Sequence, residues 1–264
     1  MLLVDSHCHL DAGEFDVDRD AVVQRARAAG VRLQVVPATH ADAWPGLREA
    51  CGAAPGLYPA YGMHPVFLDR HRPGDLERLR DWLEREHPVA VGECGLDHFL
   101  EGLDRDQQQH WFEGQLRLAR EFDLPVIVHA RRAVDAVIAA VRRIGGAGSG
   151  QANTLRGVVH SFSGSEEQAR QLWKLGFLVG LGGPVTYDRA RRLRRLAASM
   201  PLEYLLLETD APDQPDSDNR GGRNEPARLV TVLDTIARLR EADPAEIAAA
   251  TTANARRLFA LPAP

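Results

Sequence analysis

Residues 124–164 read LPVIVHARRAVDAVIAAVRRIGGAGSGQANTLRGVVHSFSG. The stretch opens on the apolar run Pro125 to His129 and closes around a second run, Gly157 to His160. Between them lie a segment with helical spacing of apolar residues and a spacer loop rich in Gly and Ser, Gly145 to Asn153. This order is typical of two parallel strands joined by a crossover helix, because a parallel connection needs a dozen or more residues.

The same alternation of apolar runs and helical patterns continues in both directions along the chain. The candidate strands are Leu2 to Asp5, Val31 to Pro37, Leu57 to Tyr61, Val89 to Glu93, Pro125 to His129, Gly157 to His160, Phe177 to Gly182 and Tyr204 to Asp210. Eight strand and helix units in about 250 residues predict an α/β fold, a single (β/α)8 TIM barrel over residues 1–264. A doubly wound open sheet is the alternative.

Individual residues mark the expected ends of helices and the loops. Ser165, followed three residues later by Gln168, predicts a capping box, and Gly176 stands where a left-handed C-terminal residue belongs. Asp104 is the predicted N-cap of another helix. A second loop, Ala211 to Pro226, is rich in Asp, Pro and Gly and is expected to cover the site.

The composition excludes several classes of protein. With 264 residues, 44% of them hydrophobic and 26% charged, the chain is not intrinsically disordered. A net charge of −5 excludes a whole surface that binds nucleic acid as a broad polycation. Three scattered cysteines argue against a disulfide framework, and no segment nears the ~18 apolar residues of a membrane span. We therefore expect a cytoplasmic protein without a membrane or protein partner.

A histidine or a carboxylate follows six of the eight predicted strands. These residues are His7 and His9 after the first strand, then His64, Glu93, His129, His160 and Asp210. One histidine after a strand is usually an ordinary loop or core residue, but six such placements together indicate a site. Because the carboxyl ends of barrel strands share one rim, we expect these side chains to meet there.

The strand order of a barrel divides most of these residues between two divalent ions. His7, His9 and Asp210 come from the first and eighth strands, which are neighbours in a closed barrel, and are predicted to hold one ion. His129 and His160 come from the adjacent fifth and sixth strands and are predicted to hold the other.

Glu93 is the expected bridge between the two ions, because a carboxylate has two oxygens for cations about 3.5–4 Å apart. A carboxylated lysine, the other common bridge in such barrels, is excluded because the only lysine, Lys174, lies in a predicted outer helix. The identity of the metal stays open among Zn²⁺, Mn²⁺ and Mg²⁺, although four imidazoles suit a transition ion better than Mg²⁺.

The motifs around these residues resemble one known family. In chain order they are VDSHCHLD, GMHP, VGECGLD, LPVIVHAR, VVHSFSG, LLLETDAP and RNEP. They closely resemble the TatD family of metal-dependent hydrolases, usually described as deoxyribonucleases, over essentially the whole chain. The resemblance implies an amidohydrolase-type barrel, the six metal ligands His7, His9, Glu93, His129, His160 and Asp210, and phosphoester hydrolysis. Two segments depart from the family pattern, residues 95–99 and 213–222, and both flank the expected substrate side.

These residues lead to a mechanistic hypothesis. A hydroxide formed on the ions attacks phosphorus, while the ions neutralise the developing charge. Asp210 orients this nucleophile and accepts its proton, and Glu208, two residues earlier, is expected beneath Asp210 or as an ordinary buried carboxylate. His64 has no place in either ligand set and is assigned to a phosphate oxygen or the leaving group, or else to a structural role at the rim.

Substrate contacts are assigned to three further residues. Arg131 follows His129 and is predicted to clamp a phosphate, together with Arg223 and Asn224 from the loop opposite. The arginine run at 189–195 lies in a helical pattern and is interpreted as a solvated outer face rather than a nucleic-acid groove.

The predicted function is a metal-dependent hydrolase of phosphoester bonds with an exonuclease-like action on DNA, or on a small phosphoester. The alternative is a carboxylic ester or amide hydrolase, such as a deacylase, because the ions activate water without choosing the electrophile. A module that binds a ligand through the ions without turnover is the third possibility.

Overall fold

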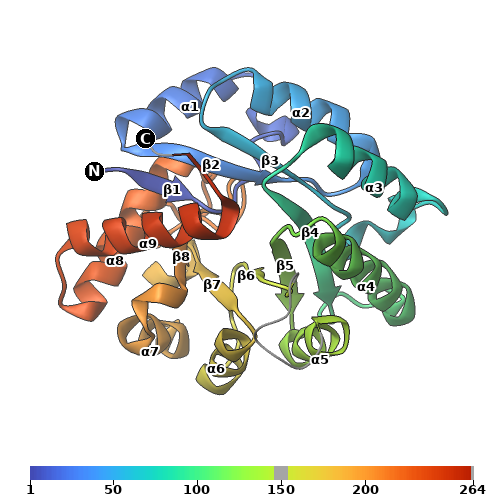
Figure 1. Ribbon diagram of the computed structural model, residues 1–264. Coiled ribbons are helices and arrows are strands. Elements are labelled where there is room, and N and C mark those ends of the chain that lie inside the picture. The colour runs from blue at the N-terminus through green and yellow to red at the C-terminus, as the bar shows by residue number, and fades with distance from the viewer. Residues whose placement is uncertain (146–153, 263–264) are drawn as a thin grey trace. The chain divides into compact units, whose positions relative to one another are not determined.

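The computed structural model describes residues 1–145 and 154–262. In these residues eight strands alternate with helices along the chain (Figure 1). The strands are β1 (Leu3–Asp5), β2 (Val31–Pro37), β3 (Leu57–Tyr61), β4 (Ala90–Asp97), β5 (Val126–Arg131), β6 (Gly157–Val159), β7 (Phe177–Leu181) and β8 (Leu205–Leu207). The recorded pairings are parallel, and the strands follow one another in the sheet in chain order, as the predicted fold class requires.

Nine α-helices lie between and after these strands in the same described residues. They are α1 (Arg19–Ala28), α2 (Trp44–Gly52), α3 (Asp75–Glu86), α4 (Arg105–Glu121), α5 (Val134–Gly145), α6 (Glu166–Lys174), α7 (Arg191–Ser199), α8 (Leu229–Arg240) and α9 (Pro244–Phe259). No helix in this part of the chain combines the length and the apolar composition needed to cross a membrane.

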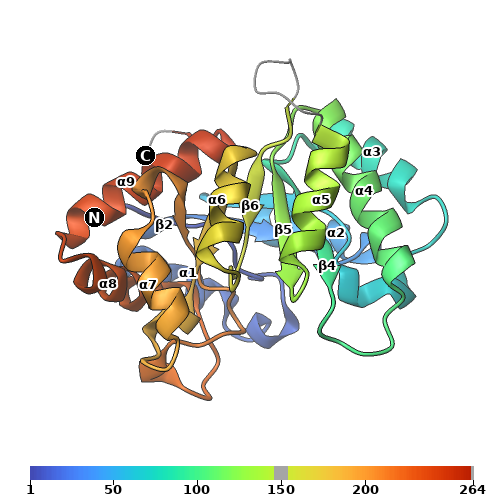
Figure 2. The same ribbon diagram turned by 90° about the horizontal axis from the view of Figure 1, so that it is seen from below.

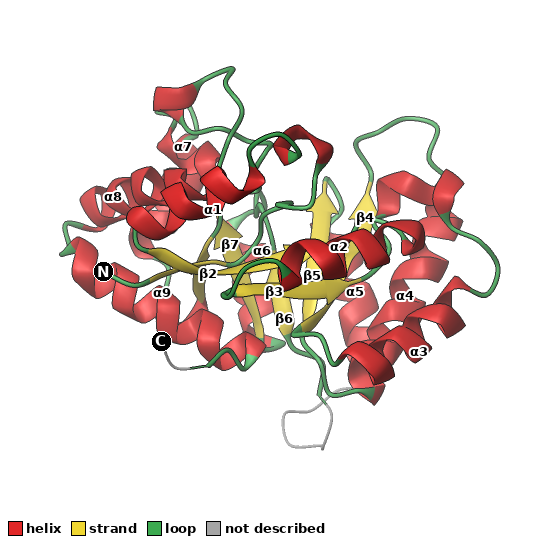
Figure 3. Ribbon diagram, turned by 90° about the horizontal axis from the view of Figure 1, so that it is seen from above, coloured by secondary structure: helices red, strands yellow, loops and turns green. Residues whose placement is uncertain are grey.

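The chain divides into two compact units, residues 1–36, 49–58 and 179–264, and residues 37–48 and 59–178. In the first unit β1 pairs with β2 and β7 with β8, and α8 packs against both α7 and α9 (Figure 3). In the second unit β3 to β6 pair in succession, and α4 lies beside α5 (Figure 2). One domain over residues 1–264 stays a prediction.

Five strands end elsewhere than predicted: β5 ends at Arg131, β6 at Val159 and β7 at Leu181, each within two residues of the predicted end, and β4 and β8 differ by more. β4 continues past Glu93 to Asp97, since a register shift between Val91 and Cys94 lets the strand resume pairing with β5. β8 ends at Leu207 and not at Asp210, because the Thr209 amide donates to the Asp5 carboxylate (3.0 Å) and Asp210 adopts a left-handed φ of 57°. Glu93 therefore lies within a strand, whereas Asp210 lies on a turn.

The predicted helix ends are confirmed. The Ser165 hydroxyl accepts the Gln168 amide hydrogen, while the Gln168 side-chain oxygen accepts that of Ser165. Asp104 caps α4 through the amides of residues 106 and 107, and Gly176 has a φ of 81°.

The structure describes all of one predicted loop but only the first residue of the other. In the loop from Gly145 to Asn153, Gly145 is the last residue of α5, and residues 146–153 lie outside the described part. The loop from Ala211 to Pro226 contains a short 3-10 helix, Ser217–Asn219, and Pro226 begins another, Pro226–Arg228.

Candidate metal centre

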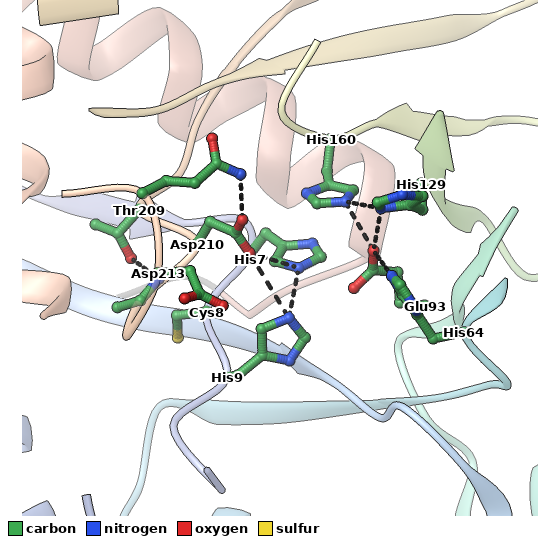
Figure 4. Close-up of polar contacts among 12 residues, drawn as sticks. His7, Cys8, His9, His64, Glu93, His129, His160, Thr209, Asp210 and Asp213 are labelled. Carbon is green, nitrogen blue, oxygen red and sulfur yellow. Dashed lines mark hydrogen bonds and ion pairs between the residues drawn. The ribbon is translucent and has the colours of Figure 1, made fainter. Parts of the chain in front are cut away.

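The first unit brings together the three residues predicted for one ion. The Nε2 atoms of His7 and His9 lie 3.2 Å apart, and each is near Oδ1 of Asp210, at 3.4 and 3.6 Å (Figure 4). Two ligand atoms about 2.1 Å from one tetrahedral ion lie about 3.4 Å from each other. The spacing therefore fits a single divalent cation held by two imidazoles and a carboxylate.

Backbone contacts join the two segments that carry these ligands, although they are about 200 residues apart in sequence. The Ser6 hydroxyl and amide both donate to the Leu207 carbonyl, at 2.9 and 3.0 Å. The Asp210 amide donates to the His7 carbonyl at 2.9 Å, and the His9 amide donates to the carbonyl of residue 211 at 2.7 Å. These backbone hydrogen bonds hold the two segments together, so the His7 and His9 imidazoles lie close to the Asp210 carboxylate.

Asp5 supports the same arrangement from beneath. Its fully buried carboxylate accepts hydrogen bonds from the Thr209 hydroxyl (2.6 Å), the Thr209 amide (3.0 Å) and the His7 amide (3.3 Å). Burial raises the pKa of Asp5 to about 7, although all three hydrogen bonds lower it. Asp5 ends the first predicted strand and has the same strand parity as His7 and His9, but no role was predicted for it.

In the second unit three imidazoles converge on one carboxylate oxygen. Oε1 of Glu93 lies 2.7 Å from Nε2 of His160, 3.0 Å from Nε2 of His64 and 3.2 Å from Nδ1 of His129 (Figure 4). The Glu93 side chain is buried, so water contributes little to this cluster. His64, Glu93 and His129 form a group able to hold a metal ion.

His64 lies beside Glu93, and its place outside both ligand sets stays a prediction. Nδ1 of His64 accepts the Val66 amide hydrogen at 3.2 Å, and this contact leaves Nε2 to face Glu93. The His64 carbonyl is in turn 3.0 Å from Nε2 of the buried His71. His64 followed a different strand from Glu93 and His129, and strand order alone did not place it beside them.

Asp97 is a site residue that the sequence analysis missed. Its Oδ2 lies 2.9 Å from Nε2 of His129, and its Oδ1 accepts the amide hydrogens of Phe99 (2.9 Å) and Leu100 (3.0 Å). Burial raises the Asp97 pKa, but the hydrogen bonds from His129 and the two amides outweigh it, so that this pKa falls well below its usual range. A carboxylate behind a metal-binding imidazole fixes its tautomer and orientation.

The same contacts act on His129. Burial lowers the pKa of His129, but its hydrogen bonds with Asp97 and Glu93 raise it by more, so the net shift is upward. In the neutral tautomer with its Nε2 proton directed at Asp97, His129 has its Nδ1 lone pair on the side of Glu93. A signal for Asp97 exists in the motif VGECGLD, where Glu93 and Asp97 have the same strand parity.

The donor sets favour a particular kind of ion. The first set offers two imidazoles and one carboxylate, and the second offers three imidazoles around one carboxylate. Imidazole nitrogen suits Zn²⁺, Mn²⁺ and related ions, whereas Mg²⁺ takes oxygen ligands. The residues present therefore fit divalent transition ions.

The residues predicted to bind substrate lie in different surroundings. Arg131 is exposed, with its guanidinium carbon 3.7 Å from the centre of the Phe99 ring. Arg223 donates to both carboxylate oxygens of Asp18 at 2.8 Å. Asn224 is buried and donates to the Thr209 carbonyl at 2.8 Å, so its side chain holds the turn that carries Asp210. For all three, substrate binding stays a prediction.

The structure also describes the surroundings of Glu208 and of the arginine run at 189–195. Glu208 is fully buried after β8, and a Cβ added at Gly180 of β7 would overlap its carboxylate. In the arginine run at 189–195, Arg194 pairs with Asp188 at 3.3 Å and the Arg189 guanidinium lies 5.3 Å from the Tyr187 ring centre.

Known proteins are similar to this chain over nearly its whole length. The family of TatD related DNases matches residues 4–260. The uncharacterized metal-dependent hydrolase YjjV of Escherichia coli (strain K12) is 40% identical over 261 residues, which cover 98% of each chain. The 3′-5′ ssDNA/RNA exonuclease TatD of Cronobacter sakazakii is 35% identical over 269 residues, covering 97% of each.

Solved structures agree with this similarity. The crystal structure of E. coli YjjV has a TM-score of 0.92, with 98% of each chain covered. An uncharacterized amidohydrolase from Saccharomyces cerevisiae, 19% identical, has a TM-score of 0.81 over 98% of this chain and 100% of its own, a likeness in fold alone. The predicted fold class, a (β/α)8 barrel of the amidohydrolase type, is thus confirmed. Together with the sequence similarity, it follows that this chain belongs to the TatD family and is a metal-dependent hydrolase.

Proposed function

We propose that this hydrolase cleaves phosphoester bonds of DNA, removing nucleotides from a strand end, with two divalent ions held by the two ligand sets. The observation that carries the proposal is the spacing within each set, 3.2 to 3.6 Å in one and 2.7 to 3.2 Å from the Glu93 oxygen in the other. The family description and the name of the C. sakazakii relative support the choice of a nucleic-acid substrate.

The proposed chemistry depends on the divalent ions that the two ligand sets would bind. Bound divalent ions supply a lowered pKa for a coordinated water and neutralise charge on the phosphoryl group. In the proposed reaction the Asp210 carboxylate orients the attacking water and takes its proton, while the side-chain amide of Gln214 donates to Oδ2 and keeps the carboxylate oriented.

The residues around Glu93 have different proposed roles. Glu93 would hold metal in this set, and a carboxylate is a side chain that can serve as a shared ligand of two ions. Because Nδ1 of His64 accepts the Val66 amide hydrogen, its Nε2 carries the proton and donates toward Glu93, so we keep His64 outside the ligand set and assign it to a phosphate oxygen or the leaving group. Asp97 holds the His129 tautomer that leaves Nδ1 available.

We assign Zn²⁺ or Mn²⁺ to these sites, because four of the six proposed ligand side chains are imidazoles. We place the reaction in the cytoplasm, where the three cysteines, Cys8, Cys51 and Cys94, remain the buried thiols that the structure describes. Arg131 and Arg223 are the proposed contacts to phosphates of the strand.

The test is a substrate panel of a DNA oligonucleotide, a nitrophenyl phosphodiester, a phosphomonoester and a carboxylic ester, each with added Mn²⁺, Zn²⁺ or Mg²⁺. We expect diester and DNA hydrolysis that EDTA abolishes and that Glu93→Gln and Asp210→Asn reduce by at least about 100-fold. Glu101→Gln, on the exposed segment after β4, is the matched control and retains activity. Turnover of the carboxylic ester alone refutes the phosphoesterase proposal and supports an esterase or deacylase.

A further inference from the structure

An exposed aromatic side chain lies just after the end of β4. Phe99 is 40% exposed and its neighbour Leu100 is 42% exposed, whereas the fully buried side chains of the core include Phe112 and Phe162. Phe99 belongs to the segment 95–99 that departs from the family pattern. Exposing two adjacent large apolar side chains to water costs free energy, so this surface is a candidate for contact with a ligand.

Two guanidinium groups lie against this ring. The guanidinium carbon of Arg131, the last residue of β5, is 3.7 Å from the ring centre of Phe99, and that of Arg132 is 4.7 Å from it. Both distances are within the range of a cation–π interaction. The ring therefore holds two positive charges close together at the end of one strand.

These two charges lack the acidic partners that other arginines have. Within residues 1–145 and 154–262, no carboxylate lies within ion-pair distance of Arg131 or Arg132. By contrast, Arg223 pairs with Asp18 and Arg228 pairs with the buried Asp216. An aromatic ring positions a guanidinium without neutralising it, so both groups keep their charge and their hydrogen-bond donors for an anion.

The position of the ring is coupled to the second ligand set. One oxygen of Asp97 accepts the amide hydrogens of Phe99 and Leu100, while its other oxygen is 2.9 Å from Nε2 of His129. The His98 amide also donates to the Arg131 carbonyl at 2.9 Å. A single carboxylate thus sets the place of both the exposed ring and a candidate metal ligand.

We propose that Phe99, Arg131 and Arg132 form a subsite for a phosphate of the nucleic-acid strand that neighbours the scissile bond. The guanidinium groups bind the phosphate oxygens, and Phe99 is a positioning residue that keeps both groups in place before the substrate arrives. The exposed ring edge and Leu100 offer apolar surface to the adjoining base. This inference rests on the proposed function and assigns binding of the strand, beyond the reacting phosphate, to this surface.

The experiment compares a DNA oligonucleotide, which has neighbouring phosphates, with a nitrophenyl phosphodiester, which has only one. For the double variant Arg131→Ala/Arg132→Ala we expect the ratio of kcat/KM for the oligonucleotide to that for the small diester to fall about 10-fold, mainly through KM. The slope of log KM against log salt concentration is expected to weaken by about 1.4, or 0.7 for each lost contact. Arg32→Ala, which removes an exposed charge at the start of β2, leaves both ratio and slope unchanged.

The role of the ring is tested by Phe99→Leu and Phe99→Trp. Leucine keeps apolar volume but has no π system, so the ratio is expected to fall about 2- to 5-fold, while tryptophan restores it. If Phe99 only packs against the protein surface, both variants change thermal stability and leave the ratio at the wild-type value. That result overturns the proposal, as does an equal loss on both substrates.

Binding separates this proposal from the proposed function. Wild-type protein stripped of metal with EDTA is titrated with a fluorescent oligonucleotide, and affinity is measured by anisotropy. The double arginine variant is expected to bind about 10-fold more weakly than wild type and Arg32→Ala. If wild type hydrolyses no phosphoester but this difference persists, only the proposed function fails; if hydrolysis is present but the difference is absent, the subsite fails.

Discussion

At the scale of single residues, the site depends on carboxylates that orient imidazoles as much as on the ligands themselves. Asp97 receives one imidazole and two backbone amides, and Asp5 receives three donors from His7 and Thr209. Within residues 1–145 and 154–262 neither carboxylate pairs with an arginine or lysine, so hydrogen bonds are what favour the ionised forms, and burial still raises the pKa of Asp5 to about 7. These contacts decide which ring nitrogen of His129 is available to an ion.

Asp97→Asn is expected to weaken metal binding by about 10- to 100-fold. The asparagine oxygen can satisfy the Phe99 and Leu100 amides, but its NH₂ group then faces Nε2 of His129 and favours the tautomer with the proton on Nδ1. Isothermal titration of the metal-free protein with Mn²⁺ or Zn²⁺ measures the change. Asp69→Asn, on an exposed side chain, is the control, and equal affinities in the two variants contradict the assigned role.

At the scale of elements, the path of β4 brings the second ligand set together. The strand resumes its pairing with β5 at Cys94, and Gly95 then lies opposite His129. Gly95 has a φ of 140°, and a Cβ there would overlap the His129 carbonyl. The absence of a side chain at this position thus permits the close approach of two strands that carry three of the site residues.

Gly95→Ala is expected to destabilise the protein by roughly 2–6 kcal/mol, the sum of about 1–3 kcal/mol for the positive φ and about 1–3 kcal/mol for the overlap. Gly102→Ala is the matched control: its φ is 83° and its Cβ would meet nothing within 4 Å, so only backbone strain applies. Urea unfolding followed by circular dichroism gives both values. Equal losses in the two variants would show that β4 has room beside His129.

At the scale of the whole molecule, each compact unit contributes the residues of one ligand set. His7, His9 and Asp210 belong to the first unit, and the set around Glu93 belongs to the second. An ion that binds the folded state alone adds to the free energy of unfolding in proportion to the logarithm of its concentration. Stability should therefore report the occupancy of both sets.

At free metal about 100 times the dissociation constant, each occupied set adds about 2.7 kcal/mol. For a chain of this length that free energy corresponds to a rise in Tm of about 5–10 °C per set, which EDTA reverses. Asp210→Asn and Glu93→Gln should each lose part of the rise, whereas Glu101→Gln should keep all of it. Differential scanning calorimetry at several metal concentrations provides the measurement. A Tm that changes neither with added metal nor with EDTA rules out both sites.

The sequence by itself determined the alternation of strands and helices, the helix caps at Asp104 and Ser165, and the placement of His or carboxylate residues in or after six strands. These features depend on local periodicity, on hydrogen bonds within a few residues and on the common direction of parallel strands, all of which can be read along the chain. The residues proposed as ligands also came from these patterns, and the structure brings them together within each unit.

Only the tertiary structure decided that His64 faces Glu93, that Asp97 orients His129, and that the chain leaves β8 at Leu207. It also placed Arg131 and Arg132 against Phe99. Such contacts join residues from separate elements, and which of several chemically equivalent partners a polar group meets depends on how strands shift in register and how side chains fill the space between them. Periodicity specifies a face of a strand, but packing chooses the neighbour.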